Sequence, residues 1–170
     1  MKVSEHIFYG GFASLVLYPT CEKQSFFFFI GSILIDLDHY IDFLYYSRFK
    51  NWSIKKMFQF HGIMSKWKDK SDILALEAFH TTEFLTGLFL VAYYFHSKEL
   101  YLLFFGMIFH LGLDLIRLTQ WKKVDLRALS FVEYWIRARK MIRSGIHPEK
   151  IFEEAYLAIS KTGNTRTPQE

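Results

Sequence analysis

The chain has 170 residues, of which 51% are hydrophobic and 19% aromatic, and its formal net charge is +4. This length suits one domain with its own core and leaves little room for two. Because Cys21 is the only cysteine, an intrachain disulfide and a cysteine-rich zinc site are both excluded. Only 9 Gly and 3 Pro interrupt the sequence, which favours helices over a turn-dense β fold.

Apolar runs and their capping signals predict an all-α fold with six helices, over residues 5–18, 25–46, 72–95, 99–118, 125–144 and 148–159. Pro19 stops the first helix, Asp125 is a plausible N-cap of the fifth, and Gly145 follows its end. Residues 1–120 are expected to form a four-helix antiparallel bundle that carries the functional site. Residues 121–160 are expected to add basic amphipathic helices packed on the bundle or on a membrane interface, and 161–170 to be a disordered tail.

The four helices of the bundle are predicted to cross a membrane. Each uninterrupted apolar stretch has only about 12–14 residues, but whole helices approach the roughly 20 that a span needs if their polar motifs are buried. Nearly all Lys and Arg fall at the N-terminus, in 47–72 and after 117, which four spans place on one side. This asymmetry predicts a protein of the inner membrane with both termini in the cytoplasm. A soluble aromatic-rich bundle, favoured by the mean hydropathy of +0.09, stays open.

An acidic motif, Ile35-Asp36-Leu37-Asp38-His39, ends the apolar run that begins at Ser25. Unpaired carboxylates are costly to bury, and a divalent metal ion satisfies carboxylates and imidazoles together. On an ideal helix Asp38 lies about 100° from His39 and about 200° from Asp36. All three point inward only if the helix distorts or if two ions bind.

Further histidines and acids recur at one end of the predicted bundle. An early histidine opens the first helix, His80 and Glu83 start the third, and His110 and Asp114 close the fourth. In an antiparallel bundle these positions share one layer, and their spacing of three or four residues places each pair on one helical face. The sequence therefore predicts a metal site with the ligands His6, Asp36, His39, His80, His110 and Asp114.

Some of these residues also have ordinary structural roles. A lone histidine on an apolar helix is usually a hydrogen-bonded core residue, so each ligand assignment depends on the convergence of the others. Glu77 is either a partner of His80 or a charge at a helix start. His61, His96 and His147 are expected on the surface, because they fall in predicted loops or turns.

The motifs of residues 5–118 resemble the membrane-bound metal-dependent hydrolase family of small bacterial and archaeal proteins. The resemblance rests on the early histidine, on Asp36-Leu37-Asp38-His39, on His80-Thr81-Thr82 and on His110 with Asp114. Ile35 stands where that family has a proline, and Ala75 where it has the first histidine of its Thr-His-Ser-type motif. The last motif is similar to the ligand spacing of zinc-dependent phospholipase C, and the resemblance implies phosphoester hydrolysis.

These observations together lead us to expect a membrane-embedded hydrolase that uses one or more divalent ions, with Zn²⁺ favoured, to activate water. Asp38 is a further ligand or catalytic group, and Glu83 is a ligand or the general base. Arg117 neutralises a phosphate oxygen or holds Asp114. A phospholipid-like phosphoester is the expected substrate, and no nucleic-acid partner is expected. The alternatives are a non-catalytic metal-binding membrane module and a soluble α-helical phospholipase- or nuclease-like enzyme.

Overall fold

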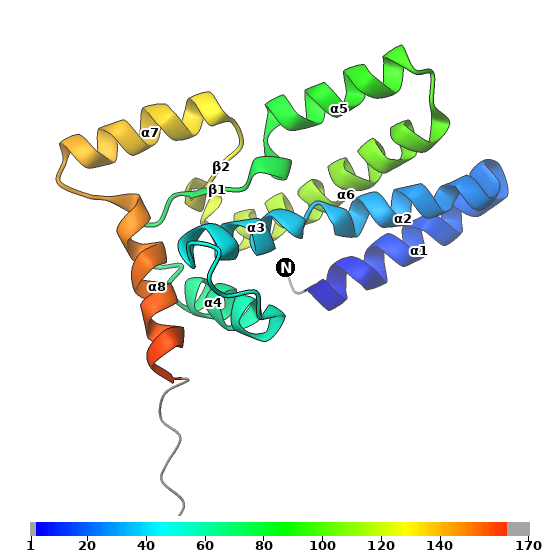
Figure 1. Ribbon diagram of the computed structural model, residues 1–170. Helices are drawn as coiled ribbons and strands as arrows, with labels where there is room; N and C mark the ends of the chain where they lie inside the picture. Colours follow the sequence, from blue (N-terminus) through cyan, green and yellow to red (C-terminus); the bar gives the residue numbers. More distant parts are fainter. Residues whose placement is uncertain (1–2, 163–170) are drawn as a thin grey trace, which may run out of the picture.

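The computed structural model describes residues 3–162 and is mostly helical (Figure 1), which confirms the all-α prediction. Its α-helices are α1 (Val3–Cys21), α2 (Ser25–Leu34), α3 (Leu37–Tyr46), α4 (Ile54–Lys66), α5 (Thr82–Tyr94), α6 (Lys98–Gln120), α7 (Phe131–Arg143) and α8 (Pro148–Thr162). Two short strands, β1 (Ala75–Leu76) and β2 (Arg127–Ala128), pair in parallel. Single turns of 3₁₀ helix form η1 (Glu22–Gln24), η2 (Ala78–His80) and η3 (Val124–Leu126).

The helices gather in two lobes (Figure 1). In one lobe α2 packs between α1 and α6, and α5 packs on α6. In the other, α3, α4 and α8 enclose an aromatic and aliphatic core that includes Phe43, Phe60 and Ile151. Helix α7 contacts the strand pair through Ala138, which packs with Leu74 and Ala128. The segment after α6 therefore packs on earlier elements of the chain through cores that it shares with them.

Helices α2 and α6 approach each other closely at two glycines. A Cβ atom on Gly31 would lie 2.1 Å from the carbonyl oxygen of Leu103, and one on Gly106 would lie 2.1 Å from that of Phe28. Because both obstacles are backbone atoms, neither position has room for a side chain. Small residues at helix crossings are typical of helices that associate in membranes, where they let backbones approach.

One helix in residues 3–162, α6, is long and apolar enough to cross a membrane by length and composition. The four-span prediction is therefore not confirmed. Helix α5 has 13 residues, which corresponds to about 20 Å and falls short of the roughly 30 Å hydrocarbon core of a bilayer. Helix α1 has 19 residues and ends at Cys21, so it stops near Pro19, as predicted from the missing N–H of proline.

The predicted continuous helix over 25–46 is wrong, because the chain breaks between α2 and α3. Asp36 N–H donates to the carbonyl of Ile33 at 3.1 Å, and His39 N–H donates to the carbonyl of Asp36 at 3.1 Å. These tighter bonds overwind the helix locally, which changes the direction of the side chains that follow. The distortion that the acidic motif required is therefore present.

The predicted start of the third helix at residue 72 is also wrong, since α5 begins at Thr82. Residues before it form β1 and η2, and the Thr81 side chain caps α5 by accepting from Phe84 N–H at 3.3 Å. The fifth helix likewise begins at Phe131 with Ser130 as its N-cap, while Asp125 lies in η3. In the segments before α5 and before α7, the chain forms the paired strands β1 and β2 where a first helical turn was predicted.

The C-terminal predictions are mixed. Gly145 follows α7 with a φ of +79°, as expected for a helix that ends on a left-handed residue. Pro148 opens α8, but α8 continues to Thr162 and so includes the first two residues of the predicted tail. Residues 163–170 of that tail lie outside the described residues.

The glycine contact between α2 and α6 makes a stability prediction. Gly106→Ala should lower the free energy of unfolding by about 2 kcal/mol, because the added methyl group meets backbone that cannot move away. Gly112 lies on the same helix with open space around its Cβ position, so Gly112→Ala should be neutral or slightly stabilising. Thermal unfolding of the two purified variants checks this, and equal midpoints would contradict the close crossing.

Candidate metal centre

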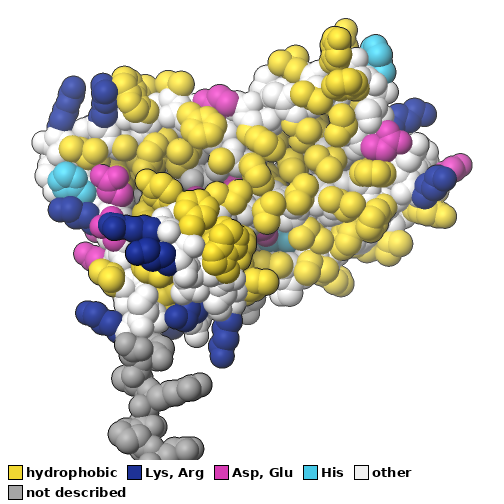
Figure 2. Space-filling view, viewed as in Figure 1, with side chains coloured by type: hydrophobic (Ala, Val, Ile, Leu, Met, Phe, Trp, Pro, Cys, Tyr) yellow, Lys and Arg dark blue, Asp and Glu magenta, His cyan; other side chains and the backbone are white. Residues whose placement is uncertain are grey.

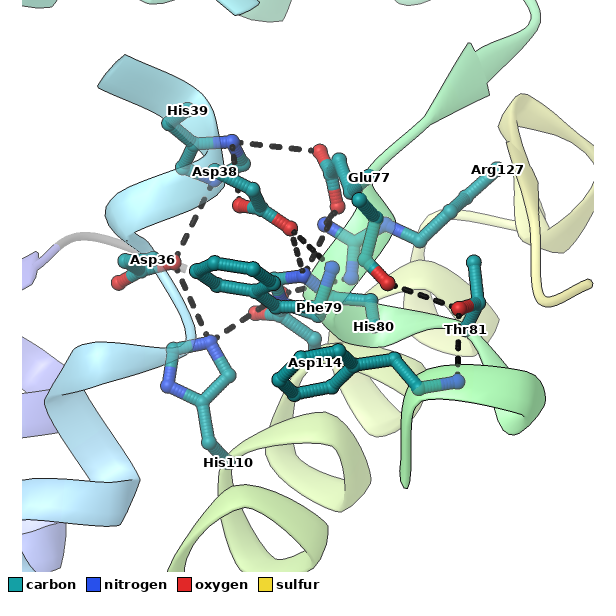
Figure 3. A network of polar contacts seen from close by, with 12 residues as sticks. Asp36, Asp38, His39, Glu77, Phe79, His80, Thr81, His110, Asp114 and Arg127 are labelled. Carbon is teal, nitrogen blue, oxygen red and sulfur yellow. Dashed lines mark hydrogen bonds and ion pairs between the residues drawn. The ribbon is translucent and has the colours of Figure 1, made fainter. Parts of the chain in front are cut away.

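Imidazole and carboxylate groups from four segments meet in one buried cluster, and Figure 3 labels its members from the α2–α3 break, η2 and α6. His6 comes from α1, the acidic motif from the α2–α3 break, and His80 from η2, while His110 and Asp114 come from α6. The six predicted ligands form one chain of contacts between nitrogen and oxygen atoms, in the order His39, Asp36, His110, Asp114 and then both His6 and His80. The predicted convergence of separated motifs is therefore present in the structure.

Asp114 is the most connected acid of the cluster. Its Oδ1 lies 3.2 Å from His6 Nε2, and its Oδ2 lies 3.7 Å from His110 Nε2 and 3.9 Å from His80 Nε2. Asp36 Oδ1 lies 3.3 Å from His110 Nε2 and 3.4 Å from His39 Nε2. Ligand atoms around a zinc ion with bonds of about 2.0–2.2 Å are roughly 3–3.6 Å apart, so these spacings suit coordination.

Two sets of three residues have ligand atoms that all lie within 4.8 Å of one another. One set is His6, Asp36 and His110, and the other is His80, His110 and Asp114. All except the partly exposed Asp36 are buried. These buried His/Asp groups can hold a metal ion.

The histidine rings are held in the orientation that a metal ligand needs. His110 donates from Nδ1 to the carbonyl of Ser32 at 2.7 Å, and His80 Nδ1 lies 2.9 Å from Asp38 Oδ2. In both rings Nε2 is buried and has no hydrogen-bond partner. A bond from one ring nitrogen fixes the tautomer and leaves the lone pair of the other free for a metal. Unpartnered buried nitrogens beside carboxylates fit a cation site better than a closed polar core.

Burial keeps His80 neutral. It lowers the pKa of His80 to about 3, and the nearby Arg127 charge adds to this effect. Burial also raises the pKa of Asp42 to about 8, with the Glu77 carboxylate as the second cause. At neutral pH an imidazole with a low pKa has an available lone pair, which is the form that binds metal.

Arg127 is a member of the site that the sequence did not predict. One of its terminal nitrogens, Nη1, lies 3.0 Å from Asp114 Oδ2, and the other, Nη2, lies 2.5 Å from Glu77 Oε2. The pairing of Ala75 with Arg127 in the strand pair brings this side chain to the cluster. Its location was hidden because two-residue strands leave no periodic pattern in the sequence.

Of the two roles expected for Glu77, its contacts favour that of a partner of the histidines. The side chain is buried, with Oε1 3.4 Å from His39 Nδ1 and Oε2 3.6 Å from His80 Nδ1. It therefore lies between the two rings and Arg127, at the edge of the cluster.

The three predicted catalytic groups lie in different surroundings. Asp38 is buried and accepts from Phe79 N–H at 3.1 Å besides contacting His80, so it orients a ligand. Arg117 pairs with Glu5 at 3.0 Å. Glu83 is not in the cluster: it accepts from Ser130 Oγ at 2.5 Å and from Phe131 N–H at 3.1 Å. The placement of Glu83 beside His80 assumed one helix through both, whereas α5 begins between them.

His61 was predicted to lie on the surface and instead packs against the cluster. Its Nε2 lies 2.8 Å from the carbonyl oxygen of His39, and the two ring centroids are 4.6 Å apart. The predicted loop around it is helix α4, which folds onto α3. His96 is exposed in the turn between α5 and α6, as expected, while His147 is only partly exposed.

A cavity of about 210 Å³ opens beside the cluster. Its wall combines groups of the cluster with cationic and aromatic side chains, including His39, His61, Lys68, Glu77, Asp114, Arg117, Trp121 and Arg127. Because Asp114 and His39 belong to both the cluster and this wall, a ligand in the cavity has direct access to an ion held there.

No family model matches this sequence, and no curated protein or solved structure does. The resemblance to membrane-bound metal-dependent hydrolases therefore rests on the motifs alone, and the function has to be argued from the geometry of the cluster and its cavity.

The unpartnered Nε2 atom of His110 makes a prediction about metal content. Purified His110→Ala should lose most of its bound divalent metal, because His110 belongs to both sets of converging ligands. His96→Ala is a matched control, since it removes an exposed histidine outside the cluster. Elemental analysis of both variants checks this, with circular dichroism to verify that they fold. Unchanged metal content in folded His110→Ala would contradict the site.

Proposed function

We propose that this protein is a membrane-embedded, metal-dependent hydrolase that cleaves a phosphoester. The observation that carries the proposal is the pair of buried Nε2 atoms on His80 and His110, which lack hydrogen-bond partners and face carboxylates beside a cavity. Catalytic metal sites need a few protein ligands and an open position that solvent or substrate can reach.

Zn²⁺ is the ion that we propose, because three or four imidazoles with one or two carboxylates suit its ligand preference. The residues that would hold it are His6, Asp36, His39, His80, His110 and Asp114. A bound zinc ion supplies Lewis acidity and activates water at neutral pH.

The chain's own groups have separable roles in such a reaction. Asp38 and the Ser32 carbonyl fix the rings of His80 and His110. Arg127 holds the carboxylates of Glu77 and Asp114 in place and balances their charge. Glu77 lines the cavity and contacts His39, so this carboxylate is positioned to accept a proton from a water molecule there.

The surface of the lobe formed by α1, α2, α5 and α6 supports a membrane location. Large apolar side chains are exposed along α1, α5 and α6, with Phe8 69%, Leu15 73% and Tyr94 78% exposed. Figure 2 shows hydrophobic side chains spread over this lobe. Soluble monomers rarely expose contiguous apolar patches of this kind. We propose that α1, α2, α5 and α6 are embedded in the inner membrane, with the polar end of the lobe and both termini on the cytoplasmic side.

A soluble enzyme of related chemistry is the second candidate. It is favoured by the finding that, within residues 3–162, one helix, α6, meets the requirements for a span. Membrane location and metal chemistry are therefore tested separately.

Membrane location predicts how the protein partitions after cell lysis. The full chain should sediment with membranes, resist extraction by alkaline carbonate and dissolve in detergent, because its apolar surface is contiguous over one lobe. Recovery in the soluble fraction without detergent would favour the second candidate.

Metal-dependent hydrolysis predicts a matched loss and recovery of activity. Detergent-purified protein should cleave a chromogenic phosphodiester or phosphomonoester. A chelator should abolish the reaction and added Zn²⁺ restore it. His80→Ala should reduce kcat by at least about a hundredfold, because it removes a ligand, while His96→Ala should retain activity. Hydrolysis that survives both the chelator and His80→Ala would remove the proposal.

A further inference from the structure

The cavity beside the candidate metal centre adjoins one face of α6 and its C-terminal end. Asp114, Arg117, Leu118 and Trp121 all line it, and they follow the spacing of three and four residues that keeps side chains on one helical face. From Asp114 to Trp121 is seven residues, which corresponds to about 10 Å along the helix axis. One part of the cavity therefore adjoins the centre, and another adjoins Trp121.

The part near Trp121 holds a cation without an acidic partner. Lys68 Nζ lies 4.5 Å from the centroid of the Trp121 ring, and Lys68 is partly buried. Among residues 3–162 it forms no ion pair, whereas the other two cations in the wall are engaged, Arg117 by Glu5 and Arg127 by Glu77 and Asp114. Lys68 is therefore the basic group in the wall that is available to a ligand.

The rest of the wall limits what else a ligand can be. Apolar side chains also line the cavity, at Met64, Ile73, Leu118, Leu126 and Phe152. Its volume of about 210 Å³ is smaller than the roughly 300 Å³ at which sites for drug-sized ligands begin. A compact molecule with an apolar middle and a charge at each end matches this lining.

We propose that the cavity binds a phosphoester that carries a second anionic group about 10 Å away, with that group held by Lys68 against Trp121. The proposal rests on the hydrolase function for the identity of the first group, since the phosphoester would lie at the metal centre. The second group is recognised by the chain alone. A free small molecule and the headgroup of an acidic lipid both offer this chemistry.

Binding of two matched probes tests the proposal without requiring turnover. One probe is an aryl phosphonate, which is not hydrolysed, with a carboxylate at the end of a short chain, and the other is its neutral methyl ester. Isothermal titration with the purified protein should give a Kd about tenfold lower for the carboxylate probe, the factor that one charge-assisted hydrogen bond contributes. Equal affinity of the two probes would overturn the proposal.

Variants at two lysines identify the residue responsible. Lys68→Met should abolish the preference for the carboxylate probe and leave the affinity for the ester unchanged. Lys66→Met makes the same charge change at an exposed residue that does not line the cavity, so it should retain the preference. A preference that persists in Lys68→Met would also overturn the proposal.

Repeating the titration with zinc-loaded and chelator-treated protein separates this inference from the hydrolase function. A Lys68-dependent preference in protein that takes up no zinc on loading would support the anion subsite and remove the metal centre. Metal binding without any preference would overturn the subsite and leave the centre. Competition by vesicles that contain phosphatidylserine, but not by phosphatidylethanolamine, would support the subsite and identify the source as a lipid headgroup. If neither kind of vesicle competes with the carboxylate probe and the preference for that probe is present, the source of the second anionic group is a free small molecule.

Discussion

The buried carboxylate of Asp114 is the group on which the arrangement of the chain depends. It contacts histidines from three segments and the guanidinium of Arg127. A carboxylate removed from water is costly unless charged and hydrogen-bonding partners surround it. Each partner comes from a different part of the chain, so satisfying this one group requires α1, η2, α6 and the strand pair to be in place together.

The close crossing of α2 and α6 fixes part of the geometry of the candidate metal centre. Gly31 and Gly106 allow the two backbones to approach, and one turn further along the ring of His110 reaches the Ser32 carbonyl. A hydrogen bond to a main-chain carbonyl is less adaptable than one to a flexible side chain. The helix crossing and the orientation of the His110 ring therefore depend on the same contact between α2 and α6.

The convergence of the histidines and acids was predictable because it follows from elementary patterns. His110 and Asp114 lie four residues apart at one end of an apolar run, and antiparallel helices bring such ends together. Helix α6 was correspondingly close to its predicted range. The apolar runs alone also predicted a helical chain, since little in the composition favours sheet.

The details that the sequence did not predict have identifiable physical causes. The break between α2 and α3, at Ile35 and Asp36, has no proline or glycine to mark it. Tighter local hydrogen bonds accompany it. Glu83 was misplaced because β1 and η2 replace the first turns of the predicted helix. Arg127 and His61 reach the centre only through tertiary contacts that no local periodicity encodes.

The parallel pairing of β1 with β2 has a consequence for the order in which the protein is completed. All six candidate ligands precede residue 115, whereas the guanidinium that faces Glu77 and Asp114 is encoded after them. A nascent chain that has emerged only as far as Gln120 carries these acids without their cation. Chains are synthesised from the N-terminus. The pairing of Arg127 with Glu77 and Asp114 therefore forms late, after the C-terminal segment has been made.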